Sequence, residues 1–329
     1  MTPDNRILIV VDPTTAEQPA VDRGFELARR LKAPVELFVC HYDSRFAGGR
    51  LFAGTERARL RREDLEHQLG YLKSLAAEHA TEADVVALRA VWDTPLAEGI
   101  IRECLRSEPR LVVKDTHHHS AVERTLFTNT DWHLVRDCPV PLWLVKPGDM
   151  QQPKILAAVD PMHEHEKPGS LDDRILDQST SLTDVLDGDL HVYHGYDATP
   201  AIARAGALAM SPTPVPVQEL THKVEADHAE AFAALLADRG LADDHRHLMA
   251  GAAFELLPTL ARRLGANLVV MGSIARGRLQ QAVVGSTAER VLEHLPCDLL
   301  IVKPDGFRSE VAYKAQAADF ETLLEDHPI

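Results

Sequence analysis

Short apolar runs alternate with longer amphipathic stretches along nearly the whole chain. Runs rich in Val, Ile and Leu are typical of buried parallel strands, and apolar residues spaced three or four apart predict helices. In the first half the pattern predicts strands at 7–12, 34–42, 83–92, 110–115 and 141–147, and helices at 16–31, 56–78, 95–105 and 125–136. The helix at 56–78 has one apolar face, typical of a helix that packs on a core. That face consists of Leu65, Leu69, Leu72 and Ala76.

The second half repeats this order of elements. Its predicted strands are 155–160, 188–196, 245–251, 268–271 and 298–302, and its predicted helices are 172–186, 218–239, 253–264 and 285–294. Strands that alternate with helices predict parallel sheets, with helices on both faces and right-handed crossovers. The fold class expected from the pattern is therefore α/β.

The two halves also match residue by residue. "RILIVVDP" (6–13) returns as "KILAAVDP" (154–161), and residues 111–147 align with 268–304 without a gap. A period of about half the chain indicates two copies of one domain rather than a solenoid of short units. We therefore expect a first domain at 1–148 and a second at 154–304. The acidic tail at 305–329 contains one short helix pattern, "DFETLLED".

The composition is that of a soluble globular protein. Of the 329 residues, 45% are hydrophobic and 26% are charged, and no apolar run is long enough to span a membrane. We expect a cytoplasmic protein that does not act at a membrane. The net charge of −15 argues against a nucleic-acid partner, because an acidic surface repels phosphate backbones. Four scattered cysteines predict reduced thiols; they are Cys40, Cys104, Cys138 and Cys297.

Several motifs together resemble a known family. They are the two "I-L-x-x-V-D-P" openings, the turn ending in "GSTAERV", the strand endings "PVPLWLVKP" and "PCDLLIVKP", and "FTNTDWHL" in the first half. The chain resembles the tandem universal stress proteins, most closely the two-domain E type. The resemblance implies a five-stranded parallel sheet in each domain, with the strands at 142–145 and 299–302 joining the domains as an intramolecular pseudo-dimer. Whether two such chains form a homodimer is left open.

The resemblance also implies a nucleotide site in the second domain. Nucleotide-binding members of the family carry Gly-x-x-Gly, nine further residues and then Gly-Ser or Gly-Thr, where a helix N-terminus presents free N–H groups to phosphates. In this chain Ala275 stands at the second glycine, which puts a methyl group into the loop. The expected ligand is ATP with magnesium. The expected binding residues are Asp160, Gly272, Ala275, Arg276, Gly277, Gly285, Ser286 and Thr287.

The first domain has lost this motif. Asp12 matches Asp160, but Asp115, His118, Thr128 and Asn129 stand where the second domain has Gly272, Ala275, Gly285 and Ser286. Side chains at these positions would fill a phosphate cradle, and one of them is an acid. We expect no phosphate binding in the first domain.

Other functions remain as alternatives to a stress-response protein that senses or sequesters a nucleotide. One is a scaffold in which neither domain binds nucleotide and the surface binds protein partners, or which binds an apolar or lipid-like ligand in a pocket lined by the apolar loops at 46–54 and 198–210. Another is a metal-dependent hydrolase that uses loop histidines, although solvated histidines are the simpler interpretation and zinc is not expected. The histidines considered for a metal are His117, His119, His163 and His165.

No catalytic residues are predicted. The chain has no Gly-x-Ser-x-Gly, no His-Glu-x-x-His and no Gly-Lys-Thr phosphate loop. At most, the motifs are compatible with slow ATP hydrolysis.

Overall fold

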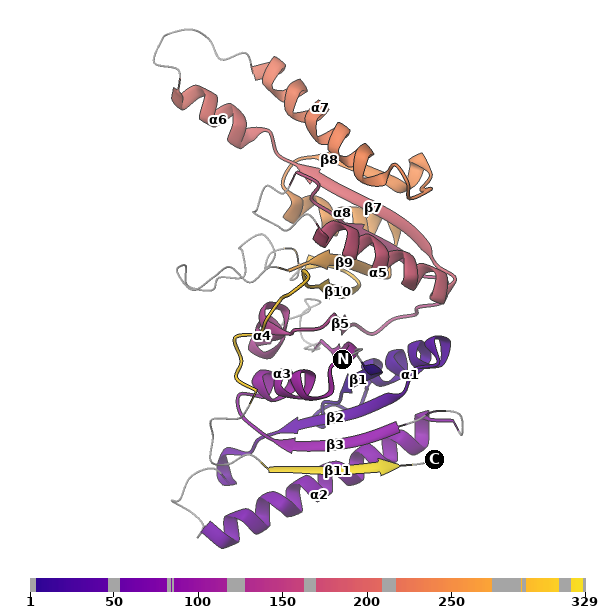
Figure 1. Ribbon diagram of the computed structural model, residues 1–329, viewed down its shortest axis with the longest axis vertical. Helices are drawn as coiled ribbons and strands as arrows, with labels where there is room; N and C mark the ends of the chain where they lie inside the picture. Colours follow the sequence, from indigo (N-terminus) through magenta and orange to yellow (C-terminus); the bar gives the residue numbers. More distant parts are fainter. Residues whose placement is uncertain are drawn as a thin grey trace. The chain divides into compact units, whose positions relative to one another are not determined.

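The computed structural model describes residues 4–46, 54–81, 84, 86–116, 128–162, 170–208, 217–273, 291, 294–313 and 321–327. The chain divides into two compact units (Figure 1). The first unit consists of Met1–Gly148 together with Asp298–Ile329, and the second consists of Asp149–Cys297. The strand at 298–302, which the sequence repeat assigns to the second copy, therefore clusters with the first unit.

The first unit is built on a mainly parallel sheet. Five parallel strands lie in the order β3-β2-β1-β4-β5, and one antiparallel strand flanks each side, β11 beside β3 and β10 beside β5. The strands are β1 (Asp4–Val10), β2 (Val35–His41), β3 (Val86–Trp92), β4 (Pro109–Asp115), β5 (Leu142–Val145), β10 (Asp298–Val302) and β11 (Glu321–His327). Residues 7–10 of β1 and 35–40 of β2 are buried without interruption, as expected of parallel strands covered by helices on both faces.

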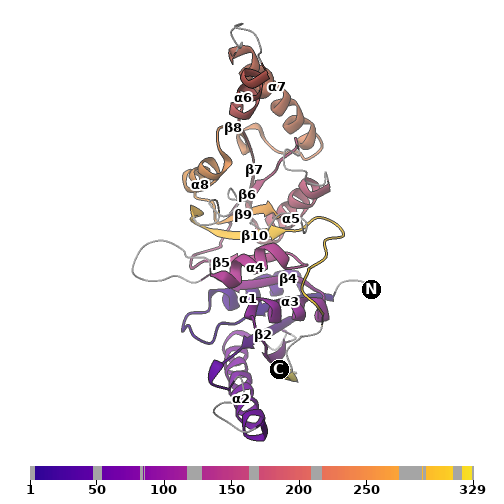
Figure 2. The same cartoon turned by 90° about the vertical axis from the view of Figure 1, so that its left-hand side faces the viewer.

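Helices cover both faces of this sheet. The α-helices are α1 (Pro19–Leu31), α2 (Gly54–His79), α3 (Leu96–Ser107) and α4 (Asn129–Asp137), and a short 3-10 helix, η1, spans Ser44–Phe46. The helices α1 and α2 contact each other, as do α3 and α4 (Figure 2). Right-handed crossovers place the first pair on one face and the second pair on the other. The predicted apolar face of α2 is confirmed, since Leu65, Leu69, Leu72 and Ala76 are all buried.

The helix predicted in the acidic tail is wrong. Residues 321–327 form the strand β11, which runs antiparallel to β3 and pairs Thr322 with Val91 and Leu324 with Arg89 (Figure 1). Without β11, β3 would be the edge strand and would expose a row of unpaired backbone N–H and C=O groups. Pairing with this edge outweighs the weak helical spacing of the segment.

Among its described residues, the second unit has four parallel strands in the order β9-β6-β7-β8. They are β6 (Lys154–Ala158), β7 (Asp189–Tyr196), β8 (Arg246–Ala250) and β9 (Leu268–Gly272). The helices are α5 (Ser170–Leu186), α6 (Thr199–Leu208), α7 (Val217–Leu236) and α8 (Ala253–Leu264), and a second 3-10 helix, η2, spans Asp243–His245. Within the described residues, no helix is both long and apolar enough to cross a membrane.

One predicted loop of the second unit is a helix instead. The apolar segment at 198–210 contains α6, which contacts α7 (Figure 2). A helix in contact with α7 therefore explains why this segment is more apolar than a surface loop. Of the other predicted apolar loop, 46–54, residues 47–53 lie outside the described residues.

Candidate functional site

Two of the predicted nucleotide-site residues lie at the carboxyl ends of neighbouring strands in the second unit. The strands β6 and β9 are parallel neighbours, and Ala158 pairs with Met271. Asp160 follows the end of β6, and Gly272 is the last residue of β9. In open α/β sheets, ligands bind at the carboxyl ends of the strands, which is where both residues lie.

The turn that carries Asp160 is held by a buried carboxylate. The backbone N–H of Asp160 donates to Oδ1 of Asp172 at 3.0 Å, and the Asp172 side chain, in the first turn of α5, is fully buried. Asp160 itself is half-buried. The turn is therefore fixed through its backbone, and a carboxylate is placed at the strand edge.

Gly272 allows close packing between β9 and α5. A Cβ at this position would lie 2.7 Å from Cδ2 of Leu171 and 3.3 Å from Cδ1 of Ile175. This close packing explains a glycine at position 272 without reference to any ligand. Its place at the strand end is compatible with a phosphate cradle, but the close approach to α5 would require a small residue there in any case.

The other predicted site residues lie outside the described residues. They are Ala275, Arg276, Gly277, Gly285, Ser286 and Thr287, and the same holds for the metal candidates His117, His119, His163 and His165. Among the described residues, the group of histidines and carboxylates that lie close enough to share a metal ion is found elsewhere, around Asp189.

A buried pair of histidines contacts the residue that precedes Asp160. Nε2 of His194 lies 2.8 Å from Nδ1 of His228, and Nδ1 of His194 lies 3.2 Å from the carbonyl oxygen of Val159. Tyr196 stacks on His228 with 5.1 Å between ring centroids. Burial and the neighbouring imidazole lower the pKa of His194, so that this ring is neutral near pH 7.

Sequence reasoning did not single out this pair. The signal for His194 is a second imidazole within the strand-forming run "HVYHGY". His228 gives no comparable signal, because polar residues are common along α7 and only the packing of α7 on β7 brings the two rings together.

The equivalent edge of the first unit holds a network of protein groups. Asp115, aligned with Gly272, ends β4, and its Oδ1 accepts a hydrogen bond from the backbone N–H of Ala20 at 2.6 Å. Next to it, Nζ of Lys114 lies 2.8 Å from Oδ1 of Asp131, and both side chains are buried. Asp131 also forms a capping box with Thr128 at the start of α4.

Asp12, the counterpart of Asp160, has local partners. Its Oδ1 accepts hydrogen bonds from the backbone N–H of Thr14 at 2.8 Å and from the Thr14 hydroxyl at 2.6 Å. These bonds turn the carboxylate back onto its own loop, as in an Asx-turn.

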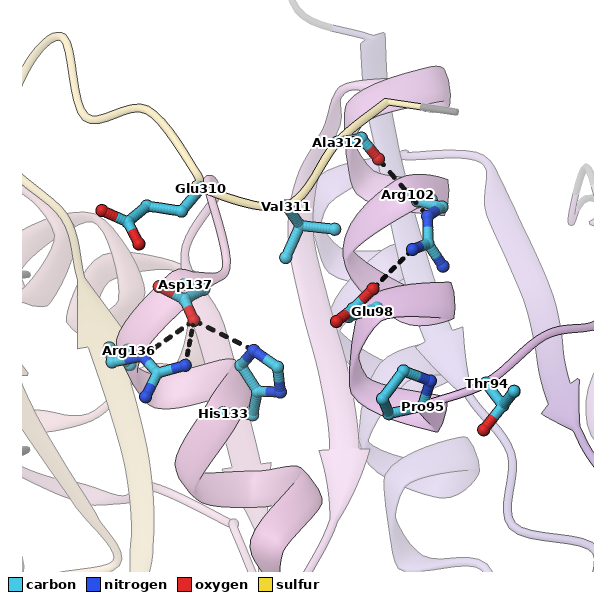
Figure 3. Close-up of a pocket in the computed structure, with 10 residues that line it drawn as sticks. All are labelled: Thr94, Pro95, Glu98, Arg102, His133, Arg136, Asp137, Glu310, Val311 and Ala312. Carbon is cyan, nitrogen blue, oxygen red and sulfur yellow. Dashed lines mark hydrogen bonds and ion pairs between the residues drawn. The ribbon is translucent and has the colours of Figure 1, made fainter. Parts of the chain in front are cut away.

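A cavity of about 600 Å³ lies in the first unit, away from this edge. It is lined by the N-terminal part of α3, the C-terminal part of α4 and residues 310–312 (Figure 3). His133 and Arg136 both contact Asp137, and their hydrogen bonds lower the pKa of Asp137 against the opposing effect of burial. Arg102 pairs with Glu98 and Asp93. Both arginines that line the cavity thus form ion pairs with carboxylates of the protein. We therefore assign no ligand to the cavity.

Comparison with known proteins gives a consistent result for most of the chain. The sequence model of the Universal stress protein family matches residues 5–146 and again 153–303. Universal stress protein E of Escherichia coli K12 is 29% identical over 309 residues, which cover 93% of this chain and 96% of that protein. The Universal stress protein E homolog of Haemophilus influenzae is 27% identical over 304 residues, covering 91% of this chain and 97% of the homolog.

Solved structures agree with these sequence matches. The crystal structure of a putative universal stress protein from Pseudomonas aeruginosa UCBPP-PA14 is similar with a TM-score of 0.70 and 26% identity, covering 92% of this chain and 94% of that one. A universal stress protein from Archaeoglobus fulgidus shares the fold, with a TM-score of 0.61 at 14% identity over 91% of this chain and 98% of the other.

Proposed function

Since the chain belongs to the universal stress protein family, we propose that it is a stress-response protein whose second unit binds a nucleotide, ATP with magnesium, at the edge formed by Asp160 and Gly272. The observation that carries this proposal is the adjacency of these two residues at the carboxyl ends of β6 and β9. Its role would be to sense or sequester the nucleotide.

The residues at this edge fit such a ligand. The half-buried carboxylate of Asp160 can accept hydrogen bonds from ribose hydroxyls, and its backbone is held by Asp172. Gly272 carries no side chain into the space after β9, where the Gly-rich segment 272–287 continues. Arg276 and Arg278 would add positive charge for the phosphates.

The chain offers a matched pair of variants for the test. Asp160→Ala removes the carboxylate at the proposed site, and Asp12→Ala removes its counterpart in the first unit. In calorimetric titrations of the full chain with magnesium ATP, we expect about one site in the wild type and at least roughly tenfold weaker binding in Asp160→Ala. Binding by Asp12→Ala should equal that of the wild type.

A third variant, Gly285→Val, tests the loop itself and should abolish binding while circular dichroism shows an unchanged fold. If the folded wild type does not bind nucleotide, or if Asp12→Ala weakens binding as much as Asp160→Ala, the proposal is wrong. The scaffold alternative, which acts through protein partners, would then be the one to pursue.

A further inference from the structure

A cluster of side chains that can act as metal ligands lies at the amino-terminal ends of β7 and β8 in the second unit. The proposed nucleotide site lies at the carboxyl-terminal ends of the strands in the same sheet. Asp189 is the first residue of β7, and His191 lies two positions further along the same strand. Because side chains alternate along a strand, both project from the same face. His245 ends η2, immediately before β8, and His247 follows inside β8. The parallel pairing of β7 with β8, which places Tyr193 opposite His247, brings these residues together.

The distances in this cluster suit a tetrahedral metal ion. Nε2 of His191 lies 3.2 Å from Oδ2 of Asp189, and Nδ1 of His245 lies 3.4 Å from Oδ1 of Asp189. One ligand atom from each of the three residues lies within 4.8 Å of the other two. In a tetrahedral zinc site with bonds of about 2.0–2.1 Å, neighbouring ligand atoms are roughly 3.3 Å apart. The three side chains are therefore already near a coordinating arrangement.

His191 is the best-fixed ligand of the three. Its side chain is only 8% exposed, and its Nε2 is buried without an aligned hydrogen-bond partner among the described residues. Its other nitrogen, Nδ1, lies 3.1 Å from Nε2 of His247. With the proton on Nδ1 donated to His247, the lone pair of Nε2 points toward Asp189. This is how an outer partner usually orients a metal-binding histidine.

The surrounding charges are mixed, and carboxylates lie closest to the ligand atoms. Besides Asp189, Oδ1 of Asp244 lies 3.9 Å from Nε2 of His245. Lys154 and Arg263 act on the cluster as cations.

We propose that Asp189, His191 and His245 bind one zinc ion, with a fourth coordination position open to solvent, and that His247 positions the ring of His191. Two imidazoles and one carboxylate suit zinc, which also binds such a set more tightly than manganese or ferrous iron does. The bound ion would tie η2 and the start of the edge strand β8 to β7.

This site is independent of the proposed nucleotide site. Asp189 and His245 lie at the amino-terminal ends of β7 and β8, whereas Asp160 and Gly272 lie at the carboxyl-terminal ends of β6 and β9. All these strands are parallel, so the two sites occupy opposite edges of the sheet. Zinc binding and nucleotide binding can therefore succeed or fail separately.

The test uses the full chain without an affinity tag, stripped of metal by a chelator and titrated calorimetrically with zinc chloride. The wild type should bind one zinc ion at this site. Asp189→Asn and His245→Gln each remove one ligand from a partly exposed position, and each should weaken binding by at least roughly a hundredfold. His222→Gln is the matched control, because His222 is an exposed histidine on α7 and its loss should change nothing.

Two further measurements guard against a misfolded variant or a different zinc site. Cobalt(II) should give the intense visible absorption of a tetrahedral site in the wild type and in His222→Gln, but not in His245→Gln. Zinc should raise the thermal unfolding midpoint of the wild type and leave that of His245→Gln unchanged. The proposal is overturned if the wild type binds no zinc, or if folded Asp189→Asn and His245→Gln bind it as tightly as the wild type. Gly285→Val should retain zinc binding.

Discussion

The two units differ most at the carboxyl ends of one pair of equivalent strands, β4 in the first unit and β9 in the second. In the first unit, β4 ends in Asp115, whose carboxylate accepts the N–H of Ala20 in the first turn of α1. In the second unit, β9 ends in Gly272, which has no side chain to offer. A carboxylate at a helix N-terminus interacts with the free N–H groups and the helix dipole much as a bound anion does. The first unit thus holds a carboxylate at the end of β4, where the second unit has a glycine at the end of β9.

A second difference strengthens this interpretation. Beside Asp115, the buried pair of Lys114 and Asp131 links the end of β4 to the cap of α4. Met271 stands where the first unit has Lys114, so the second unit cannot make the same pair. At this position the first copy of the repeat has side-chain contacts that the second copy lacks. The predictions below test how much stability those contacts contribute.

The largest effect is expected from Asp131→Ala. The substitution leaves Lys114 as a buried charge without its partner at 2.8 Å and removes the capping box of α4. Breaking a buried pair from one side costs about 3–5 kcal/mol. Urea denaturation should show a loss of this size. As a control, Glu63→Ala disrupts an exposed pair on α2 and should cost no more than about 0.5 kcal/mol.

The second prediction makes the first unit resemble the second. Asp115→Gly leaves the N–H of Ala20 without its carboxylate acceptor at a buried position. Loss of the partner of a buried donor costs about 1–3 kcal/mol of unfolding free energy, measurable by urea denaturation. The variant should still not bind ATP, because Asp12 remains turned onto Thr14. If Asp115→Gly binds ATP at an additional site, the side chain at position 115 alone explains the difference in nucleotide binding between the units.

The third prediction concerns pH, to which the two units should respond in opposite directions. Burial, and then the neighbouring Glu103, raise the pKa of Glu36 from 4.5 to about 7, although Arg6 and Arg106 also contact it. A raised folded-state pKa stabilises the folded first unit below pH 4.5, and this contribution is lost as the pH rises to about 7. The lowered pKa of His194 does the reverse in the second unit, where stability is lost as the pH falls below 6.5.

Hydrogen exchange converted to opening free energies reports each unit separately. Protection of the first unit should fall between pH 4.5 and 7, by an amount on the order of 1–3 kcal/mol. Glu36→Gln cannot ionise and should remove this dependence without changing that of the second unit. Parallel pH profiles of wild type and Glu36→Gln would show that Glu36 is not the cause.

Much of the fold could be predicted from the sequence, because buried parallel strands are continuous apolar runs and α2 has a regular apolar face. The tail could not, since the pairing of β11 with the free edge of β3 is a tertiary effect that outweighs the local spacing of "DFETLLED". Asp160 and Gly272 could be placed at the carboxyl ends of two strands, because each follows a short apolar run that the sequence itself marks as a buried strand. The cluster of His191 and His245 could not, since its members come from separate elements and meet only through the pairing of β7 with β8.

The smallest effect is expected from Gly272→Ala, which brings the second unit one step toward the first. The added Cβ would lie 2.7 Å from Cδ2 of Leu171, so the end of this flexible side chain must move. Overpacking of this kind typically costs about 1 kcal/mol. If Gly272 serves packing alone, the loss appears in urea denaturation and ATP affinity is unchanged. If it also forms part of the nucleotide site, Gly272→Ala weakens ATP binding while Gly24→Ala, which crowds Ile9 in the first unit, lowers stability alone.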